Sequence, residues 1–291
     1  PGCLFVALAG ERFDACEFAA QAIASGAAAV MVSRAVVVPD GAGVVLVDDT
    51  LAGLQALAAA YRRVWGGQVI GLTGSNGKTS TKDMIRAVLA RRFKVCATRG
   101  NLNNHIGLPL TVLSAEAGET HGVFEMGMNH PGEIAPLAAI AGPDVAVITN
   151  IGTAHIEYMG TQDAIAWEKA TLPAQVKRSG VVVLNANDKY TPVITRHCQA
   201  TVSTAGVNAG DVSATNLRAD GTGTTFTLDF SGEKVETRLP ILGEHMVANA
   251  ALADGSLYVS DSARAATLSQ RLSEIDERLL HLLERWESLG G

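Results

Sequence analysis

The sequence predicts an α/β protein with a small N-terminal α/β domain, a central domain built on a parallel sheet with an antiparallel meander, and a C-terminal helix. Apolar runs at 69–72, 122–124, 145–148 and 181–184 alternate with helical stretches and lack in/out alternation, as parallel strands covered on both faces do. From about residue 200 to 239, apolar and polar residues alternate between turns at Asp220-Gly221 and Ser231-Gly232, as in antiparallel strands. The tail carries a heptad seam from Ala265 to Leu289.

Residues 1–66 predict the small first domain. Strands are expected at 4–8, 28–32 and 44–47, and helices at 13–25 and 50–64, the second capped by Asp49 or Thr50. Gly66-Gly67 marks the expected boundary, so the central domain takes residues 67–253 and the helical tail 254–291. The chain opens inside a strand pattern, so we expect this domain to be incomplete at its start.

Composition excludes several classes of protein. The 291 residues carry a net charge of −6, which argues against a nucleic-acid binder that depends on a basic surface. No uncharged apolar run reaches the ~20 residues of a membrane span. The four cysteines are far apart and show no metal-ligand spacing, which favours reduced thiols in a cytoplasmic protein.

The motif Gly74-Ser75-Asn76-Gly77-Lys78-Thr79-Ser80 stands between an apolar strand and a helical pattern. In a strand, glycine loop and helix of this kind, the backbone N–H groups of the loop and the positive end of the helix dipole point at the same site. Such a site binds phosphate. Lys78 would reach the outer phosphates, and the Thr79 hydroxyl would bind the accompanying Mg²⁺. Leu72 stands where the longer form of this motif has glycine, and the alternative is a glycine-rich turn before a surface helix.

Three further candidates follow the central strands. Glu125 comes directly after residues 122–124, and a carboxylate suits Mg²⁺, although a solvated strand-end acid is the alternative. His155 follows the apolar run that ends near residue 152, where a structural histidine is the alternative. Lys169 falls on an expected helix, where a solvated charge is the alternative.

Two polar groups complete the set. Asn101, Asn103 and Asn104 lie in a loop after the strand at 94–97, and could be simple turn residues. His245 and Asn249 are four residues apart, so one helical face would carry both. Spacing alone assigns neither group a role.

Taken together, these stretches resemble the Mur ligase family. The match includes Glu125-Met126-Gly127-Met128-Asn129-His130-Pro131-Gly132-Glu133-Ile134 and the phosphate loop, and continues through residues 4–11, 47–51, 100–109, 149–155 and 243–249. It covers residues 1 to about 253. Within the family, residues 125–134 resemble most the member that joins D-alanyl-D-alanine to UDP-N-acetylmuramoyl-tripeptide.

The resemblance implies roles for the candidates. Residues 74–80 would bind ATP phosphates, Thr79 and Glu125 would hold one Mg²⁺, and His155 would serve a second. Lys169 matches the family's lysine that CO₂ carbamylates: a bare ammonium repels Mg²⁺, whereas a carbamate is an anion with two oxygens. Lys78, Glu125, His155 and Lys169 form the implied catalytic set.

The implied substrates follow. Asn249 would contact adenine, with His245 shaping that pocket, and the loop with Asn101, Asn103 and Asn104 would face the UDP-muramoyl-peptide. The small domain would bind the uridine end. ATP would phosphorylate the tripeptide carboxylate, and the amine of D-Ala-D-Ala would attack the acyl phosphate.

The sequence departs from the family pattern at three places. Asp14-Ala15-Cys16 replaces the usual Asp-Gly-His, which bears on the uridine pocket, and Thr171 replaces the acid usual after the carbamylated lysine. The match stops near Ala253, where Asp254-Gly255 is expected to break the helix, and too few residues remain for the family's third domain. We therefore expect a truncated ligase or a fusion that binds ATP without ligating.

The tail resembles the C-terminal helical arm of soluble ATP-binding-cassette proteins. Its seam could pack on its own domain or associate with a second helix. Two other functions stay open: another member of the superfamily, such as folylpolyglutamate synthase, whose usual Gly-Lys-Gly contrasts with Lys78-Thr79 here, and a non-enzymatic ATP-binding or assembly module.

Overall fold

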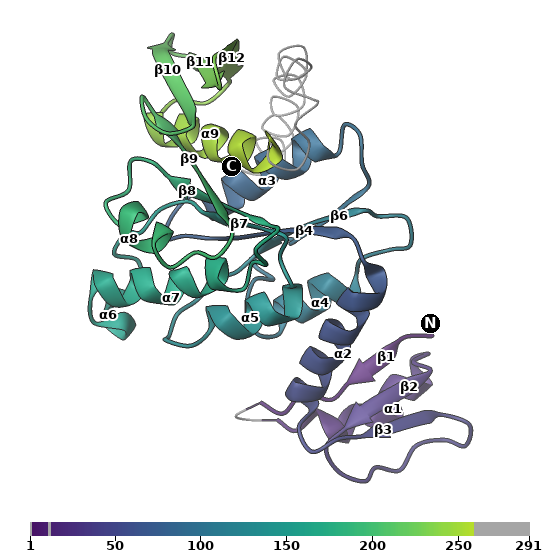
Figure 1. Cartoon of the computed structure of the whole chain (residues 1–291). Helices are drawn as coiled ribbons and strands as arrows, with labels where there is room; N and C mark the ends of the chain where they lie inside the picture. Colours follow the sequence, from purple (N-terminus) through teal and green to yellow (C-terminus); the bar gives the residue numbers. More distant parts are fainter. Residues whose placement is uncertain (1, 11–12, 259–291) are drawn as a thin grey trace.

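The structure, a computed structural model, describes residues 2–10 and 13–258 (Figure 1). The first unit is a parallel sheet in the order β1-β2-β3, made of β1 (Leu4–Val6), β2 (Ala29–Val32) and β3 (Gly43–Leu46). A short 3-10 helix η1 (Ala15–Phe18) and α1 (Ala19–Ala24) pack on it through Cys16 and Ala19. The helix begins later than predicted because the Asp14 carboxylate accepts the Cys16 N–H at 2.9 Å.

Helix α2 (Thr50–Trp65) joins this unit to the rest of the chain. Asp49 is its cap, accepting N–H groups of the first turn, while the Thr50 hydroxyl donates to the carbonyl of Ala7 at 2.8 Å. At the other end, Arg62 Nε donates to the carbonyl of Ala141 at 2.6 Å. The helix thus contacts both units, and a domain boundary at residue 66 stays a prediction.

The central sheet has nine strands in the order β12-β11-β10-β9-β8-β7-β4-β6-β5. Its first five strands in the chain are parallel: β4 (Gln68–Thr73), β5 (Val95–Ala97), β6 (His121–Glu125), β7 (Val145–Ile148) and β8 (Val181–Asn185). β4 lies between β6 and β7, so the strand order reverses there. Ligands of open parallel sheets bind at such a switch point, beyond the carboxyl ends of the strands.

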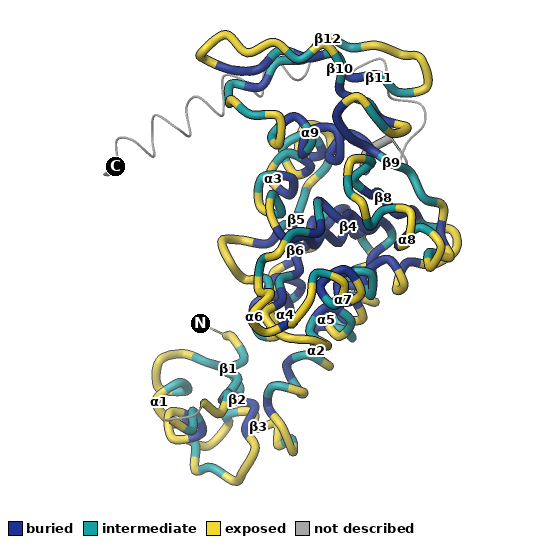
Figure 2. Tube along the Cα trace, turned by 90° about the vertical axis from the view of Figure 1, so that its left-hand side faces the viewer, coloured by how far each residue is buried: buried dark blue, intermediate teal, exposed yellow. Residues whose placement is uncertain are grey.

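Helices cover both faces of this sheet (Figure 1). On one face lie α4 (Gly107–Leu113), α5 (Ile134–Ala141) and α7 (Gln162–Ala174), with the short α6 (Ile156–Met159) and α8 (Thr191–Thr195) beside them. On the other lie α3 (Lys78–Leu89) and α9 (Glu244–Tyr258). Figure 2 shows the strands between them as buried, which explains their continuous apolar runs.

The predicted antiparallel meander is smaller than expected. It consists of β10 (Val212–Ala219), β11 (Thr224–Phe230) and β12 (Glu233–Leu239), with the predicted turns between them. β9 (Thr201–Val207) instead runs parallel to both β8 and β10, so it extends the parallel sheet. It lies inside the sheet between β8 and β10, and its buried end, with Ala205 and Val207, belongs to the same apolar cluster as helix α9.

The expected helix break at Asp254-Gly255 is wrong, because α9 continues to Tyr258. Gly255 lies against the sheet, where a Cβ would stand only 3.3 Å from Val183 Cγ1, so the missing side chain permits close packing of helix on sheet. The heptad seam from Ala265 to Leu289 lies outside the described residues. Within the part of the chain that the structure describes, no helix is long and apolar enough for a membrane span.

Candidate active site

The phosphate loop closes between β4 and α3. Gly77 has φ +77°, a conformation that favours glycine, and Gly74 has the Thr149 hydroxyl where a Cβ would stand. Lys78 Nζ donates to the carbonyl of Gly74 at 2.9 Å, so the lysine folds back over the loop it follows. Burial lowers the pKa of Lys78, while the Glu125 carboxylate opposes the shift. The predicted strand, glycine loop and helix are confirmed.

The loop after β7 hydrogen-bonds to the phosphate loop. Thr149 Oγ1 donates to the carbonyl of Asn76 at 2.6 Å, and Asn150 Oδ1 accepts the Asn76 N–H at 3.0 Å. The Gly152 N–H donates to Ser75 Oγ at 2.8 Å. Thr149 and Asn150 were not predicted from the sequence as individual site residues, although polar residues directly after a buried strand at this edge were the available signal.

Glu125 is the centre of a polar cluster at the end of β6. It is 2% exposed, and its Oε2 accepts the Thr79 hydroxyl at 3.0 Å while its Oε1 accepts Asn103 Nδ2 at 2.8 Å. The backbone N–H of Glu125 donates to Thr98 Oγ1 at 2.9 Å, which fixes the strand end. A carboxylate and a hydroxyl side by side at the start of α3 fit Mg²⁺, which takes few protein oxygens and fills its remaining positions with phosphate and water. Among the described residues no group of three or more His, Cys, Asp or Glu could hold a metal ion, so such an ion would depend on this oxygen pair and the nucleotide.

Lys169 is buried on α7, with 2% of its surface exposed. Burial and, after it, the charge of Lys78 lower the pKa of its amine to about 7, while the charge of Glu168 acts in the opposite direction. The carboxylate of Glu168 points elsewhere, because its two oxygens accept the N–H groups of Gly132 and Ile134, each at 2.8 Å. A solvated surface lysine is therefore excluded, and with a pKa of about 7 the amine is about half neutral at pH 7.

The remaining candidates are less closely joined to this cluster. His155 is exposed and has φ +64° in front of α6. Asn104 Oδ1 accepts the N–H of Gly107 at 2.8 Å, so this oxygen supports the start of α4, and Asn101 is exposed. A ligand role for these three stays a prediction.

On α9, Asn249 is 5% exposed and lies against the phosphate loop. A Cβ at Gly77 would stand 2.6 Å from Asn249 Oδ1, so the helix and the loop are in contact at this point. His245 is exposed one turn earlier, with its ring over Gly243.

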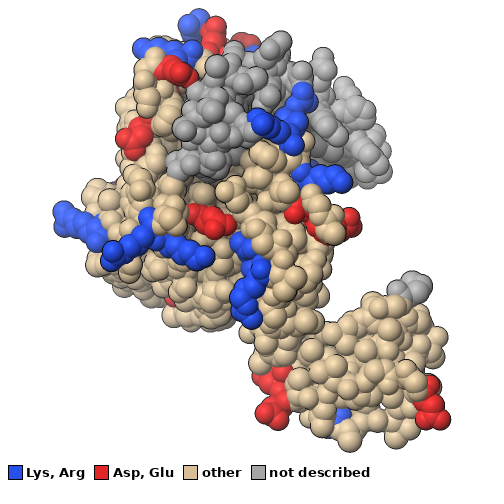
Figure 3. All heavy atoms as spheres, turned by 45° about the vertical axis from the view of Figure 1, so that its right-hand side comes forward, with Lys and Arg blue, Asp and Glu red and all other residues tan. Residues whose placement is uncertain are grey.

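In the described part of the small unit, the guanidinium of Arg34 is paired with a carboxylate. Arg34 Nε donates to Asp14 Oδ2 at 2.8 Å, and this hydrogen bond together with those from Cys16 lowers the pKa of Asp14 to about 2. On the face shown in Figure 3, basic side chains gather on the central unit, and the small unit shows mainly uncharged and acidic surface. Asp14, at the first departure from the family pattern, is thus engaged with Arg34.

The comparisons with known proteins agree with this geometry. A sequence profile of the Mur ligase middle domain matches residues 72–257. The UDP-N-acetylmuramoyl-tripeptide–D-alanyl-D-alanine ligase of Bacillus subtilis (strain 168) is 43% identical over 259 residues, 88% of this chain and 56% of the relative. The enzyme of the same name from Escherichia coli (strain K12) is 37% identical over 281 residues, 94% of this chain and 61% of the relative.

The chain is also similar to solved structures of MurF ligases. The crystal structure of MurF from Acinetobacter baumannii is 35% identical with a TM-score of 0.86, covering 92% of this chain and 59% of that one. MurF ligase from Thermotoga maritima in complex with ADP is 31% identical with a TM-score of 0.79, covering 87% of this chain and 58% of that one. The chain thus spans 56% to 61% of the length of the two curated relatives.

Proposed function

The chain belongs to the Mur ligase family, and on that premise we propose that it carries the ATP-activating site of a ligase that joins D-alanyl-D-alanine to UDP-N-acetylmuramoyl-tripeptide. The 43% identity to a ligase of that name supports the choice within the family. Because the chain spans little more than half of that relative, the whole reaction and its substrates are part of the proposal.

The phosphate loop is the proposed ATP site. The loop glycines leave room for phosphate oxygens beside backbone N–H groups, and the start of α3 adds its positive dipole. Lys78, now folded onto the Gly74 carbonyl, would turn to the outer phosphates. Asn249, buried beside Gly77, would contact adenine, and His245 would border that pocket.

Two metal positions are proposed. Thr79 and Glu125 would hold one Mg²⁺, and His155 with carbamylated Lys169 would hold the second. When bound, Mg²⁺ stabilises negative charge on the transferring phosphoryl group. The neutral fraction of the Lys169 amine supports carbamylation, in which nitrogen bonds to the carbon of CO₂ and one proton leaves to solvent. The product carries a negative charge that no longer repels Lys78.

The reaction would take two steps. An oxygen of the tripeptide carboxylate attacks the γ-phosphorus of ATP, the bond to the bridging oxygen breaks, and ADP leaves. The D-alanyl-D-alanine amine then attacks the acyl carbon, phosphate leaves with the carbon–oxygen bond electrons, and the nitrogen releases a proton. Lys78 would stabilise charge in the first step. The loop with Asn101, Asn103 and Asn104 would hold the peptide end, and the small unit the uridine end.

The observation that carries the proposal is the contact of Thr79 with Glu125 at the end of the phosphate loop. The test is calorimetry with ATP and Mg²⁺, followed by phosphate release with and without UDP-N-acetylmuramoyl-tripeptide. We expect wild type to bind ATP and Lys78→Ala to lose most of that affinity while keeping its fold. Unchanged affinity in Lys78→Ala would reject the loop as the phosphate site.

The second measurement separates an enzyme from a binding module. Tripeptide-dependent phosphate release supports the ligase, whereas ATP binding that no peptide affects supports an ATP-binding module. A cytoplasmic location is part of the proposal, because ATP is the expected substrate and the described cysteines are free thiols.

A further inference from the structure

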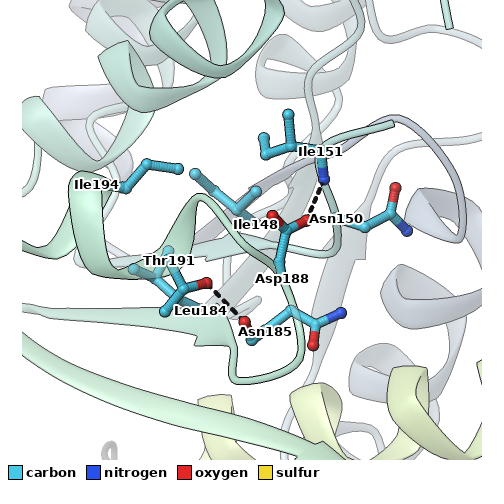
Figure 4. Close-up of a pocket in the computed structure, with 8 residues that line it drawn as sticks. All are labelled: Ile148, Asn150, Ile151, Leu184, Asn185, Asp188, Thr191 and Ile194. Atoms are coloured by element: carbon cyan, nitrogen blue, oxygen red, sulfur yellow. Dashed lines mark hydrogen bonds between the residues drawn. The ribbon is translucent and has the colours of Figure 1, made fainter. Parts of the chain in front are cut away.

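The loop after β8 contacts residues 149–152, the segment that hydrogen-bonds to the phosphate loop. Figure 4 shows Asp188 pointing from this loop toward the backbone of Ile151. Asp188 Oδ2 accepts the Ile151 N–H at 2.6 Å, and its Oδ1 accepts the Tyr190 N–H at 2.9 Å. Asn185, the last residue of β8, donates from Nδ2 to the carbonyl of Thr149 at 2.8 Å.

A second contact holds the other backbone polar group of Ile151. Gln162 Nε2 donates to the carbonyl of Ile151 at 2.8 Å, and Lys189 Nζ donates to Gln162 Oε1 at 2.9 Å. Both backbone polar groups of Ile151 are therefore held by side chains. Gln162 is the first residue of α7, the helix that carries Lys169.

The held segment is the one that supports the phosphate loop. Thr149 and Asn150 bond to Asn76, and Gly152, next to Ile151, bonds to Ser75. A displacement of Ile151 would therefore move atoms that hold the phosphate loop in place.

We propose that Asp188, assisted by Asn185, is a positioning residue for nucleotide binding. It contacts no part of the expected ATP site, and acts by fixing residues 149–152 beneath the phosphate loop. The inference rests on the proposed function, because it needs that loop to bind ATP. A carboxylate suits the task, since each of its oxygens accepts one backbone N–H and a hydrogen bond to a charged acceptor is stronger than a neutral one.

The test compares Asp188→Ala with Asp211→Ala. Asp211 is a matched control, because its carboxylate also fixes a backbone N–H beside a strand, that of Thr204 at 2.7 Å, but touches neither residues 149–152 nor the phosphate loop. ATP affinity with Mg²⁺ is measured by calorimetry at a temperature where circular dichroism shows each variant folded. We expect Asp188→Ala to bind ATP about tenfold more weakly, and Asp211→Ala to stay within about twofold of wild type while melting earlier.

An isosteric change sharpens the result. Asp188→Asn should lose most of the same affinity, because its amide NH₂ must face either the Ile151 or the Tyr190 N–H. Hydrogen exchange should be faster at residues 149–152 and 75–76 in both Asp188 variants, and unchanged there in Asp211→Ala.

Three outcomes decide the matter. ATP affinity in both Asp188 variants within twofold of wild type overturns the inference and leaves the proposed function standing. Wild type that binds no ATP overturns both. If the Asp188 variants do not fold, Gln162→Ala replaces them: it frees the Ile151 carbonyl, and about threefold weaker ATP binding with faster exchange at 75–76 supports the inference, whereas wild-type values overturn it.

Discussion

Thr79 and Glu125 share a hydrogen bond of 3.0 Å that joins the first turn of α3 to the last residue of β6. The pair places a hydroxyl oxygen and a carboxylate side by side at the switch point of the sheet. The affinity of the pair for Mg²⁺ depends on the negative charge of Glu125. The contribution of the pair to the stability of the fold depends only on its hydrogen bond.

The first prediction separates these two contributions. Glu125→Gln keeps one acceptor oxygen and the size of the side chain, but removes the negative charge. We expect Mg²⁺-dependent ATP affinity to fall about 10- to 100-fold, because Mg²⁺ loses an anionic ligand. Calorimetry with and without Mg²⁺ measures this. Glu236→Gln, an exposed change on β12, is the control, and equal Mg²⁺ dependence in both variants would contradict the assignment.

The second prediction concerns Gly77. Gly77→Ala forces φ +77° on a residue with a Cβ, at a cost of ~1–2 kcal/mol, and sets that Cβ against Asn249. We expect ATP affinity to fall at least about tenfold, because the loop must shift to relieve the contact. Gly118→Ala is a matched control: its φ is +93°, but a Cβ there meets nothing within 4 Å. Equal ATP affinity of the two variants would contradict the prediction, because the contact of the new Cβ with Asn249 would then have no effect on nucleotide binding.

The third prediction concerns the buried amine of Lys169. Its pKa in the folded chain is about 7 against 10.5 for an ordinary lysine, so between these values the unfolded chain holds a proton that the folded chain lacks. Folded-state stability therefore rises with pH from about 7 to 10.5, and the protonated buried amine costs stability below pH 7. In CO₂-free buffer, the stability of wild type relative to Lys169→Met should increase with pH by several kcal/mol, ~5 at most.

Urea unfolding at a series of pH values measures this difference. Lys177→Met removes an exposed positive charge and serves as the control. Carbamylation itself is tested by ¹³C NMR in ¹³C-bicarbonate, where a carbamate signal should appear in wild type and be absent from Lys169→Met. A pH-independent difference in the urea series would mean that the amine reaches water.

The fourth prediction concerns Asp254 on α9, which is 7% exposed. Burial raises its pKa from 3.8 to about 7, so between these values the folded chain holds a proton that the unfolded chain has lost. This contribution to stability is present below pH 4 and is lost as pH rises through 7. The side chain of the Asp254→Asn variant cannot ionise. The stability of this variant relative to wild type should therefore rise with pH, by up to about 4 kcal/mol at pH 8. Thermal unfolding at pH 4 and pH 8 decides it, and a constant difference would contradict the prediction.

The sequence predicted those features that depend on local pattern. The phosphate loop, the strand ending at Glu125 and the hairpin turns at Asp220 and Ser231 follow from apolar periodicity and turn residues. The burial of Lys169 could not be read from its own helix, because it depends on the helix face that the sheet covers.

Other features depended on pairings between distant segments. β9 runs parallel to β10 although its pattern alternates, since alternation reports which face is covered and not the strand direction. Asn185 and Asp188 were missed for a similar reason: their partners, Thr149 and Ile151, are more than thirty residues away, and only the order of β7 and β8 brings them together.

Helix α2 connects the two units, with contacts to each of them at its ends. Its 16 residues span about 24 Å, so a tilt of about 5° at the end held by Arg62 displaces the small sheet by about 2 Å. Partway along, Gln55 Nε2 donates to the carbonyl of His105 at 3.1 Å, next to the loop whose Asn103 bonds to Glu125. Helix α2 and the segment from Asn103 to His105 thus form one hydrogen-bonded connection between the small sheet and the oxygen cluster at the end of β6.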